Sequence, residues 1–301
     1  MKSSLLNLSL AIGSTLLATQ AHSAAILAES WNADSEAIGT GVGGDGWNGT
    51  GQHAGFGSMG AVPFSAISTL GAAQTGCAQV WDPGSGANEW GQITAWNGFD
   101  VNGVTDVDRN DFSFELIISP DTLSGGMQYI LESGGTGDGM GLTLIDNMLV
   151  LGVNSGNAAP VDDQTLSVDL SSLYSPTNPN FDDFLNIRFS FQPSATAGSI
   201  SLSAHNLGNQ ATVAGSTPWL DTDWDGGDAG GIGYFTGGRG GDRSNQLTNL
   251  GTGVAADWTH FDGQIAKLNT YTGILTAAPE PSRALLFGLG LSGLLLRRRK
   301  S

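Results

Sequence analysis

The sequence is poor in cysteine and histidine. Cys77 is the only cysteine in 301 residues, so no disulfide framework stabilises this chain. An unpaired thiol is most often a small buried hydrophobe, and catalysis by it would need a neighbouring base. Four histidines are present, and none lies in a recognisable motif with Cys77. These shortages exclude a disulfide-rich scaffold and argue against a cysteine nucleophile.

Basic residues are also scarce. All 28 acidic residues, 22 of them aspartate, lie between Glu29 and Glu280, and the same stretch has five basic residues, which gives it a net charge of −23. Such a surface repels nucleic acid and anionic polymers, and it favours divalent cations. We therefore expect no nucleic-acid partner. An adaptation to export or to high salt, with no specific ligand, would give the same composition.

Long apolar runs occur only near the two ends of the sequence. Lys2 precedes an apolar core at residues 5–17, and small residues at 21–25 suit signal peptidase. Residues 1–24 are therefore expected to be a signal peptide, cleaved after Ser23 or Ala24. The remaining residues, 25–275, are enough for one large domain with a sizeable core.

The C-terminal segment 276–301 has three parts. A proline-stiffened turn comes first, then an uncharged stretch at 284–296, then a basic tail at 297–301. Thirteen helical residues span roughly 20 Å against a hydrocarbon core of about 30 Å, which suits a transient anchor better than a permanent span. The cations would stay on the cytoplasmic side. A buried C-terminal helix of the globular domain is the alternative.

This segment resembles the PEP-CTERM sorting signal of exported Gram-negative bacterial proteins. The namesake motif is matched by Pro279, Glu280 and Pro281, and the basic cluster by Arg297, Arg298, Arg299 and Lys300. The resemblance implies recognition by an exosortase-type membrane peptidase. It also implies transient anchoring, removal of the tail near the motif, and delivery to the cell surface or extracellular matrix.

Between the ends, helical periodicity is nearly absent and strand patterns recur. Residues 112–118 and 185–192 alternate apolar and polar side chains, and 199–204 alternate with small polar residues. Three more strands are expected at 127–132, 140–145 and 148–153, with a turn at Asp146-Asn147. Residues 28–100 are interpreted as loops and short strands packed on the same domain. The pattern predicts an all-β fold of two antiparallel sheets, each wet on one face, with long Gly/Asp-rich loops.

Residues 82–275 resemble the laminin-G-like branch of the concanavalin A-like jelly rolls. The similarity rests on residues 111–118, the hairpins at 127–153, and the closing pattern Phe261-x-Gly263-x-Ile265. The resemblance implies a jelly-roll sandwich that binds glycans or proteins through rim loops, sometimes with calcium. In the closing pattern, Phe261 and Ile265 are expected in the core, and Gly263 is expected to permit a close approach.

Two acidic loops could hold a cation, residues 106–111 and residues 221–228, and the second is the main candidate calcium site. Alternate carboxylates followed by Gly226 resemble the start of an EF-hand loop, but Ile232 stands where a bidentate Glu belongs. A looser calcium loop or a solvated turn remain open. The flanking Trp219 and Trp224 are candidates for stacking on sugar rings, with core packing as the alternative. The candidate metal ligands are Asp221, Asp223, Asp225 and Asp228.

Catalytic residues are not expected. No E-x-D-x-E pattern of a retaining glucan hydrolase and no G-x-S-x-G motif occurs. Two functions remain. The first is a non-catalytic surface or matrix module that binds extracellular polysaccharide, with calcium as its one candidate cofactor. The second is a structural matrix component without a specific ligand, and a glycan-active hydrolase is the less supported third.

Overall fold

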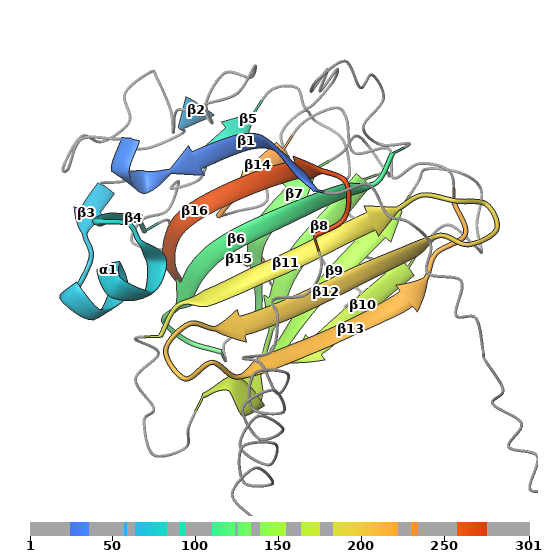
Figure 1. Cartoon of the computed structure of the whole chain (residues 1–301). Coiled ribbons are helices and arrows are strands. Elements are labelled where there is room, and N and C mark those ends of the chain that lie inside the picture. The colour runs from blue at the N-terminus through green and yellow to red at the C-terminus, as the bar shows by residue number, and fades with distance from the viewer. Residues whose placement is uncertain are drawn as a thin grey trace, which may run out of the picture.

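The computed structural model describes residues 25–35, 57–58, 64–82, 91–93, 110–123, 126–133, 139–154, 164–174, 183–221, 230–233 and 258–275. Within them, two eight-stranded sheets form a β-sandwich, and nearly all strand pairs are antiparallel (Figure 1). This confirms the predicted all-β sandwich of jelly-roll type. The expected signal peptide, the sorting segment and residues 222–229 of the acidic loop lie outside the described residues.

The front sheet of Figure 1 has the order β13-β12-β11-β6-β16-β4-β3, and β1 also pairs with β16. In its central strands β6, β11 and β12, apolar and polar side chains alternate most clearly in the sequence, because one face of each strand packs in the core. The strands are β1 (Ile26–Asn32), β3 (Phe64–Ala66), β4 (Gln79–Trp81), β6 (Phe112–Pro120), β11 (Leu185–Gln192), β12 (Ser199–Asn206), β13 (Thr212–Pro218) and β16 (Gly263–Thr272).

The back sheet has the order β10-β9-β8-β7-β14-β5-β2, and β15 pairs in parallel with β7. The three strands expected at 127–153 are present, with the turn at Asp146-Asn147. The strands are β2 (Gly57–Ser58), β5 (Gly91–Ile93), β7 (Met127–Ser133), β8 (Gly139–Ile145), β9 (Met148–Asn154), β10 (Gln164–Asp169), β14 (Gly230–Ile232) and β15 (Trp258–His260).

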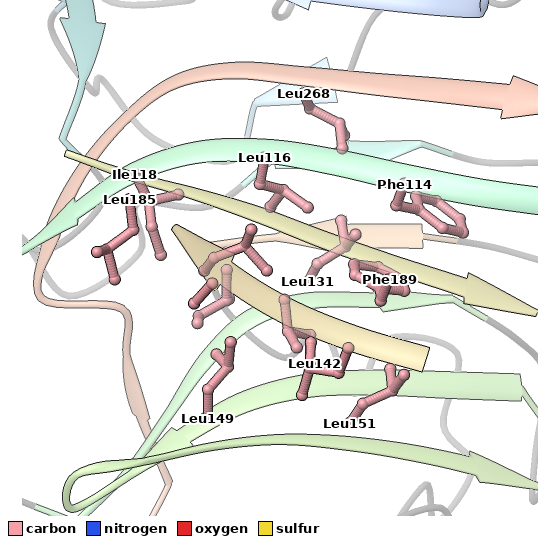
Figure 2. Packing of buried hydrophobic residues seen from close by; sticks show 14 of the residues in the cluster. Phe114, Leu116, Ile118, Leu131, Leu142, Leu149, Leu151, Leu185, Phe189 and Leu268 are labelled. Atoms are coloured by element: carbon pink, nitrogen blue, oxygen red, sulfur yellow. The ribbon is translucent and has the colours of Figure 1, made fainter. Parts of the chain in front are cut away.

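The core lies between the two sheets (Figure 2). The inward positions of β6 and β11 are aligned by their register, so that Phe114 lies opposite Phe189. The two rings stack with centroids 4.7 Å apart. Leucines of β7, β8 and β9 meet these rings from the back sheet. The predicted inward residues of β6, β11 and β12 are thus confirmed.

The closing pattern has the predicted structural role. Phe261 and Ile265 are fully buried in the core. A Cβ atom on Gly263 would lie 2.4 Å from the Ser119 carbonyl oxygen and 2.8 Å from the Pro120 Cα, both of them backbone atoms. Only a residue without a side chain lets β16 begin this close to the end of β6.

The structure adds to two expectations: the interpretation of residues 28–100 as loops and short strands, and the prediction that each sheet has one solvated face. Residues 28–100 contribute strands to both sheets, and they also contain the helix α1 (Thr69–Thr75). Ser68 caps the N-terminus of this helix, and Gly76, in the left-handed region (φ 69°), caps its C-terminus. This helix covers one end of the front sheet's outer side (Figure 1). A second apolar cluster lies there, comprising Cys77, Val80, Ile117, Phe184 and Ala266. The outer side of the front sheet is therefore partly covered by apolar packing and is not solvated throughout.

The strand ends of the front sheet form two rims. At the rim to the right in Figure 1, here called the Asp221 rim, Phe112 pairs with Thr272, which pairs with Ile26. Asp221 follows the end of β13 at this rim. At the opposite rim, the Asp121 rim, Pro120 pairs with Gly263. Both ends of the described domain thus leave from the Asp221 rim.

Candidate functional site

The outer side of the front sheet carries a continuous polar surface. Side chains alternate along each strand, so the residues between the inward phenylalanines and leucines of β6, β11 and β12 point outward. Register then aligns them across strands, with Ser203, Arg188, Glu115 and Asn269 in one row. We call this surface the polar face. Its members are Ser113, Glu115, Asn186, Arg188, Ser190, Gln192, Ser199, Ser201, Ser203, His205, Thr212, Ser216, Asn269 and Tyr271.

Glu115 is at the centre of the polar face and is only 8% exposed. Its Oε1 accepts hydrogen bonds from Asn186 Nδ2 at 3.0 Å and from Arg188 Nε at 2.9 Å, and Arg188 Nη2 lies 2.8 Å away. Its Oε2 accepts from Asn269 Nδ2 at 3.0 Å and from the Tyr271 hydroxyl at 2.9 Å. One carboxylate therefore fixes four side chains from two neighbouring strands.

These contacts keep Glu115 ionised. Burial alone would raise the pKa of the carboxyl, but the hydrogen bonds from Asn186 and Asn269, the charge of Arg188 and the Tyr271 hydroxyl together outweigh it and lower the pKa. The same arrangement affects Tyr271, where burial and then the Glu115 charge raise the pKa of the phenol to about 12. At neutral pH the cluster therefore holds one anion, one guanidinium cation and a neutral tyrosine.

This chemistry is unsuited to proton transfer. A general acid or base needs a pKa near the working pH, whereas the pKa values of Glu115 and Tyr271 are displaced away from neutrality. A retaining glycosidase also needs a second carboxyl about 5 Å from the first. The hydrogen-bond partners of Glu115 are two amides, a guanidinium and a phenol. The cluster therefore positions neighbouring side chains on the polar face.

The end of the described chain crosses the polar face. Beyond β16, the segment 273–275 lies against two serines of neighbouring strands. The Ser113 hydroxyl donates to the Gly273 carbonyl at 2.7 Å and accepts from the Leu275 N–H at 2.9 Å. The Ser190 hydroxyl donates to the Leu275 carbonyl at 3.4 Å. Residues 273–275 are therefore held against the sheet.

The structure places only part of the predicted site. Trp219 is 1% exposed and packs edge-on against Phe191, with centroids 6.2 Å apart. The prediction that Trp219 stacks on a sugar is wrong for this arrangement, because a fully buried indole offers no free face. Asp221, the first residue of the acidic loop, is buried at the rim. The other candidates, Asp223, Trp224, Asp225 and Asp228, lie outside the described residues.

Neither a cluster of metal-ligating side chains nor a membrane-spanning helix occurs in the described part of the chain. No group of three or more histidine, cysteine, aspartate or glutamate side chains in it is placed to hold a metal ion. No helix among the same residues has both the length and the apolar character needed to cross a membrane.

A group of three aspartates at the Asp121 rim was not singled out in the sequence. Asp121 follows β6, Asp262 precedes β16 and Asp82 follows β4. Partial burial, the charge of Asp262 and the charge of Asp82 raise the pKa of Asp121. A backbone hydrogen bond holds Asp121 and Asp262 close together, because the Asp121 N–H donates to the Asp262 carbonyl at 2.9 Å. The three charges repel one another across strand ends.

Replacing Asp121 by asparagine should therefore stabilise the protein at neutral pH. The folded state raises the pKa of Asp121, so the ionised carboxylate destabilises the fold. This destabilisation is absent below the ordinary pKa of about 3.8 and complete above the raised, folded-state pKa. Water screens so exposed a group, so we expect a gain of at most about 1 kcal/mol. Melting temperatures at pH 3 and pH 7 should show the gain only at pH 7. A gain of equal size at both pH values would contradict the repulsion.

Cys77 has the environment of a structural thiol. It is 1% exposed in the cluster beneath α1. Burial is the main influence and raises the pKa of the thiol. We expect the folded protein to resist a thiol reagent such as DTNB, which attacks the thiolate, and to react fully once denaturant is added. Rapid labelling of the native protein would contradict this burial.

Comparisons with known proteins show similarity at the level of fold. No protein-family model matches the chain, and no curated protein has a matching sequence. Solved structures do match. The binding domain of botulinum neurotoxin serotype G is 8% identical with a TM-score of 0.51, and the match covers 88% of this chain and 51% of that one. The receptor-binding domain of the mosaic serotype C/D neurotoxin is 9% identical with a TM-score of 0.48, covering 87% and 50%. The chain spans about half the length of these structures, and the serotype G match shows a shared β-sandwich fold.

Proposed function

We propose that this chain is an exported, non-catalytic β-sandwich module that binds extracellular polysaccharide at the cell surface or in the matrix. The observation that carries the non-catalytic part is the state of Glu115, an ionised carboxylate saturated by Asn186, Arg188, Asn269 and Tyr271. A shared fold does not specify an activity, so the neurotoxin likeness adds only that this architecture occurs in a protein named a binding domain.

The export part rests on the two ends of the sequence. We propose that signal peptidase removes residues 1–24. We further propose that an exosortase-type peptidase recognises Pro279-Glu280-Pro281 and removes the tail. The intact mass of protein from the native host should correspond to a start near Ala24 and an end near Pro279. Recovery of chains that still carry residues 297–301 would support a retained anchor instead.

The calcium part rests on the acidic loop. The first candidate ligand, Asp221, is held at a buried position where β13 ends, so a cage built on it would start from a fixed point. Calcium binding to the folded state alone should stabilise by about 2.7 kcal/mol at a hundredfold excess over Kd. For a domain of this size that is a rise of roughly 5–10 °C in Tm.

Thermal denaturation in calcium, with magnesium at equal ionic strength as the control, tests this part. Magnesium requires a tight octahedral shell and should give only the smaller rise due to charge screening. The double variant Asp223→Asn/Asp225→Asn should lose the difference between the two ions. Equal rises with both ions, unchanged in the variant, would reduce the loop to a solvated turn.

Binding itself is tested by measuring retention of the protein on polysaccharides, with calcium and with EDTA. Retention on at least one polysaccharide supports a binding module. Absence of retention on all of them, with a correctly folded protein, would favour a structural matrix component.

A further inference from the structure

The polar face differs in charge from the rest of the molecule. The strands β13, β12, β11, β6 and β16 contain a single acidic residue, Glu115, and the other 27 acidic residues lie elsewhere in the chain. Glu115 is neutralised by Arg188 at 2.8 Å. What remains on this face is hydroxyl and amide groups with His205, and the cation Lys267 lies on the same side of β16. The polar face therefore has no net negative charge in an otherwise strongly acidic protein. Its central row is largely buried, and the members that solvent reaches are Asn186, Arg188, Gln192, Ser199, Ser201, Thr212, Ser216 and Tyr271.

The polar face is also rigid. Glu115 fixes the orientation of Arg188 and Tyr271, and the side chains of Asn186 and Asn269 are fixed in the same way. The Ser113 and Ser190 hydroxyls lie 3.0 Å apart and hold residues 273–275. A surface whose side chains are already ordered loses little conformational entropy when a ligand binds.

Two acceptors beside Glu115 are left without a donor in the described part of the chain. The amide oxygens of Asn186 and Asn269 are buried and make no hydrogen bond. Turning either amide over would put its oxygen against the carboxylate of Glu115, so the orientation is imposed by charge. Both oxygens have almost no solvent-accessible area, so a ligand lying on the polar face reaches them only if these side chains move.

These properties fit an uncharged polysaccharide. Sugar hydroxyls both donate and accept, which matches a surface of serine, threonine, asparagine and glutamine. Five strands at about 4.8 Å spacing give a width of about 19 Å, enough for an extended polymer to lie flat. An anionic chain would be repelled by the surrounding carboxylates, and a cationic one would be drawn to them. An interface between two copies would be more apolar at its centre.

We infer that the polar face, and not the acidic loop, is the surface on which this module binds an uncharged polysaccharide. The inference rests on the proposed function, because it names the site and the ligand class of that same binding activity. Binding at this face needs no calcium, since the Glu115 cluster is complete without a metal ion.

Affinity electrophoresis of the full-length chain tests this inference. Native gels would contain mixed-linkage β-glucan, dextran or alginate, each with calcium or EDTA. The test variant is Gln192→Glu/Ser216→Glu, which adds two charges to the face at positions that are not directly opposite. The matched control is Thr165→Glu/Ser167→Glu, which adds two charges to exposed positions of the edge strand β10. Melting temperatures confirm that all variants fold.

We expect a neutral gel to retard the wild-type chain and the control equally, with calcium or with EDTA. The face variant should bind at least tenfold more weakly, and alginate should retard none of them. A different result would place the site in the acidic loop: the face variant is still retarded, but retardation is lost in EDTA and in the variant Asp223→Asn/Asp225→Asn. That result would overturn this inference and leave the proposed function standing. Absence of retardation in every gel would overturn both. A dimer in sizing experiments that the face variant abolishes, without polysaccharide binding, would identify a second copy as the occupant and overturn the inference.

Discussion

Replacing Glu115 by alanine should lower the free energy of unfolding by about 3 kcal/mol, or roughly 6–12 °C in Tm. The loss comes from its partners, because Arg188 would be left as a poorly solvated charge and three further donors would lose their acceptor. Chemical denaturation at neutral pH measures the loss. Ser167→Ala, at an exposed position of β10, is the control and should change stability by less than about 0.5 kcal/mol.

The same carboxylate gives a pH dependence with a definite sign. The folded state lowers the pKa of Glu115, so its contribution is complete above the ordinary value near 4.5 and is lost as the pH falls through the folded-state value. The difference in stability between wild type and Glu115→Gln should therefore shrink on acidification below about pH 4.5. A difference that stays constant down to pH 2 would show that the charge of Glu115 contributes nothing.

Replacing Trp219 by alanine should destabilise the protein by about 3–5 kcal/mol, because it removes a fully buried indole from the contact with Phe191 and leaves a cavity. The neighbouring Leu220 is 49% exposed, so Leu220→Ala is the matched control and should be nearly neutral. Thermal and denaturant unfolding measure both. An unchanged Tm together with weaker polysaccharide binding would restore Trp219 as a ligand-stacking residue.

The period-two pattern was sufficient to predict the sandwich. Residues 112–118 and 185–192 alternate so regularly that their inward sets are those of the structure. Several strands were not recognised, and β13 and β10 show why. In β13, Gly215 lies close to Leu166, and its small, weakly hydrophobic residues carry little periodic signal. In β10, at the sandwich edge, only Val168 is fully buried, so alternation gave little evidence there.

The polar cluster was missed because its signal lies between strands. Glu115 and Arg188 each occupy the middle outward position of an alternating strand. Nothing within either strand pairs them, and only the register that places Phe114 opposite Phe189 brings them together. Trp219 was misread for a related reason. A tryptophan beside an acidic loop looks the same in the sequence whether its ring turns outward to solvent or inward onto Phe191.

The position of β16 has a consequence for the order in which the domain is assembled. This strand is the last of the described strands, yet it pairs with β6, β4 and β1, and its partner β1 begins at Ile26. The front sheet thus remains split until the chain has been made as far as Thr272. The pairing of β1 with β16 is expected to form slowly, because a loop of more than 200 residues must close before the two strands can make stabilising contacts. A chain synthesised from its N-terminus therefore cannot complete the front sheet until β16 is available.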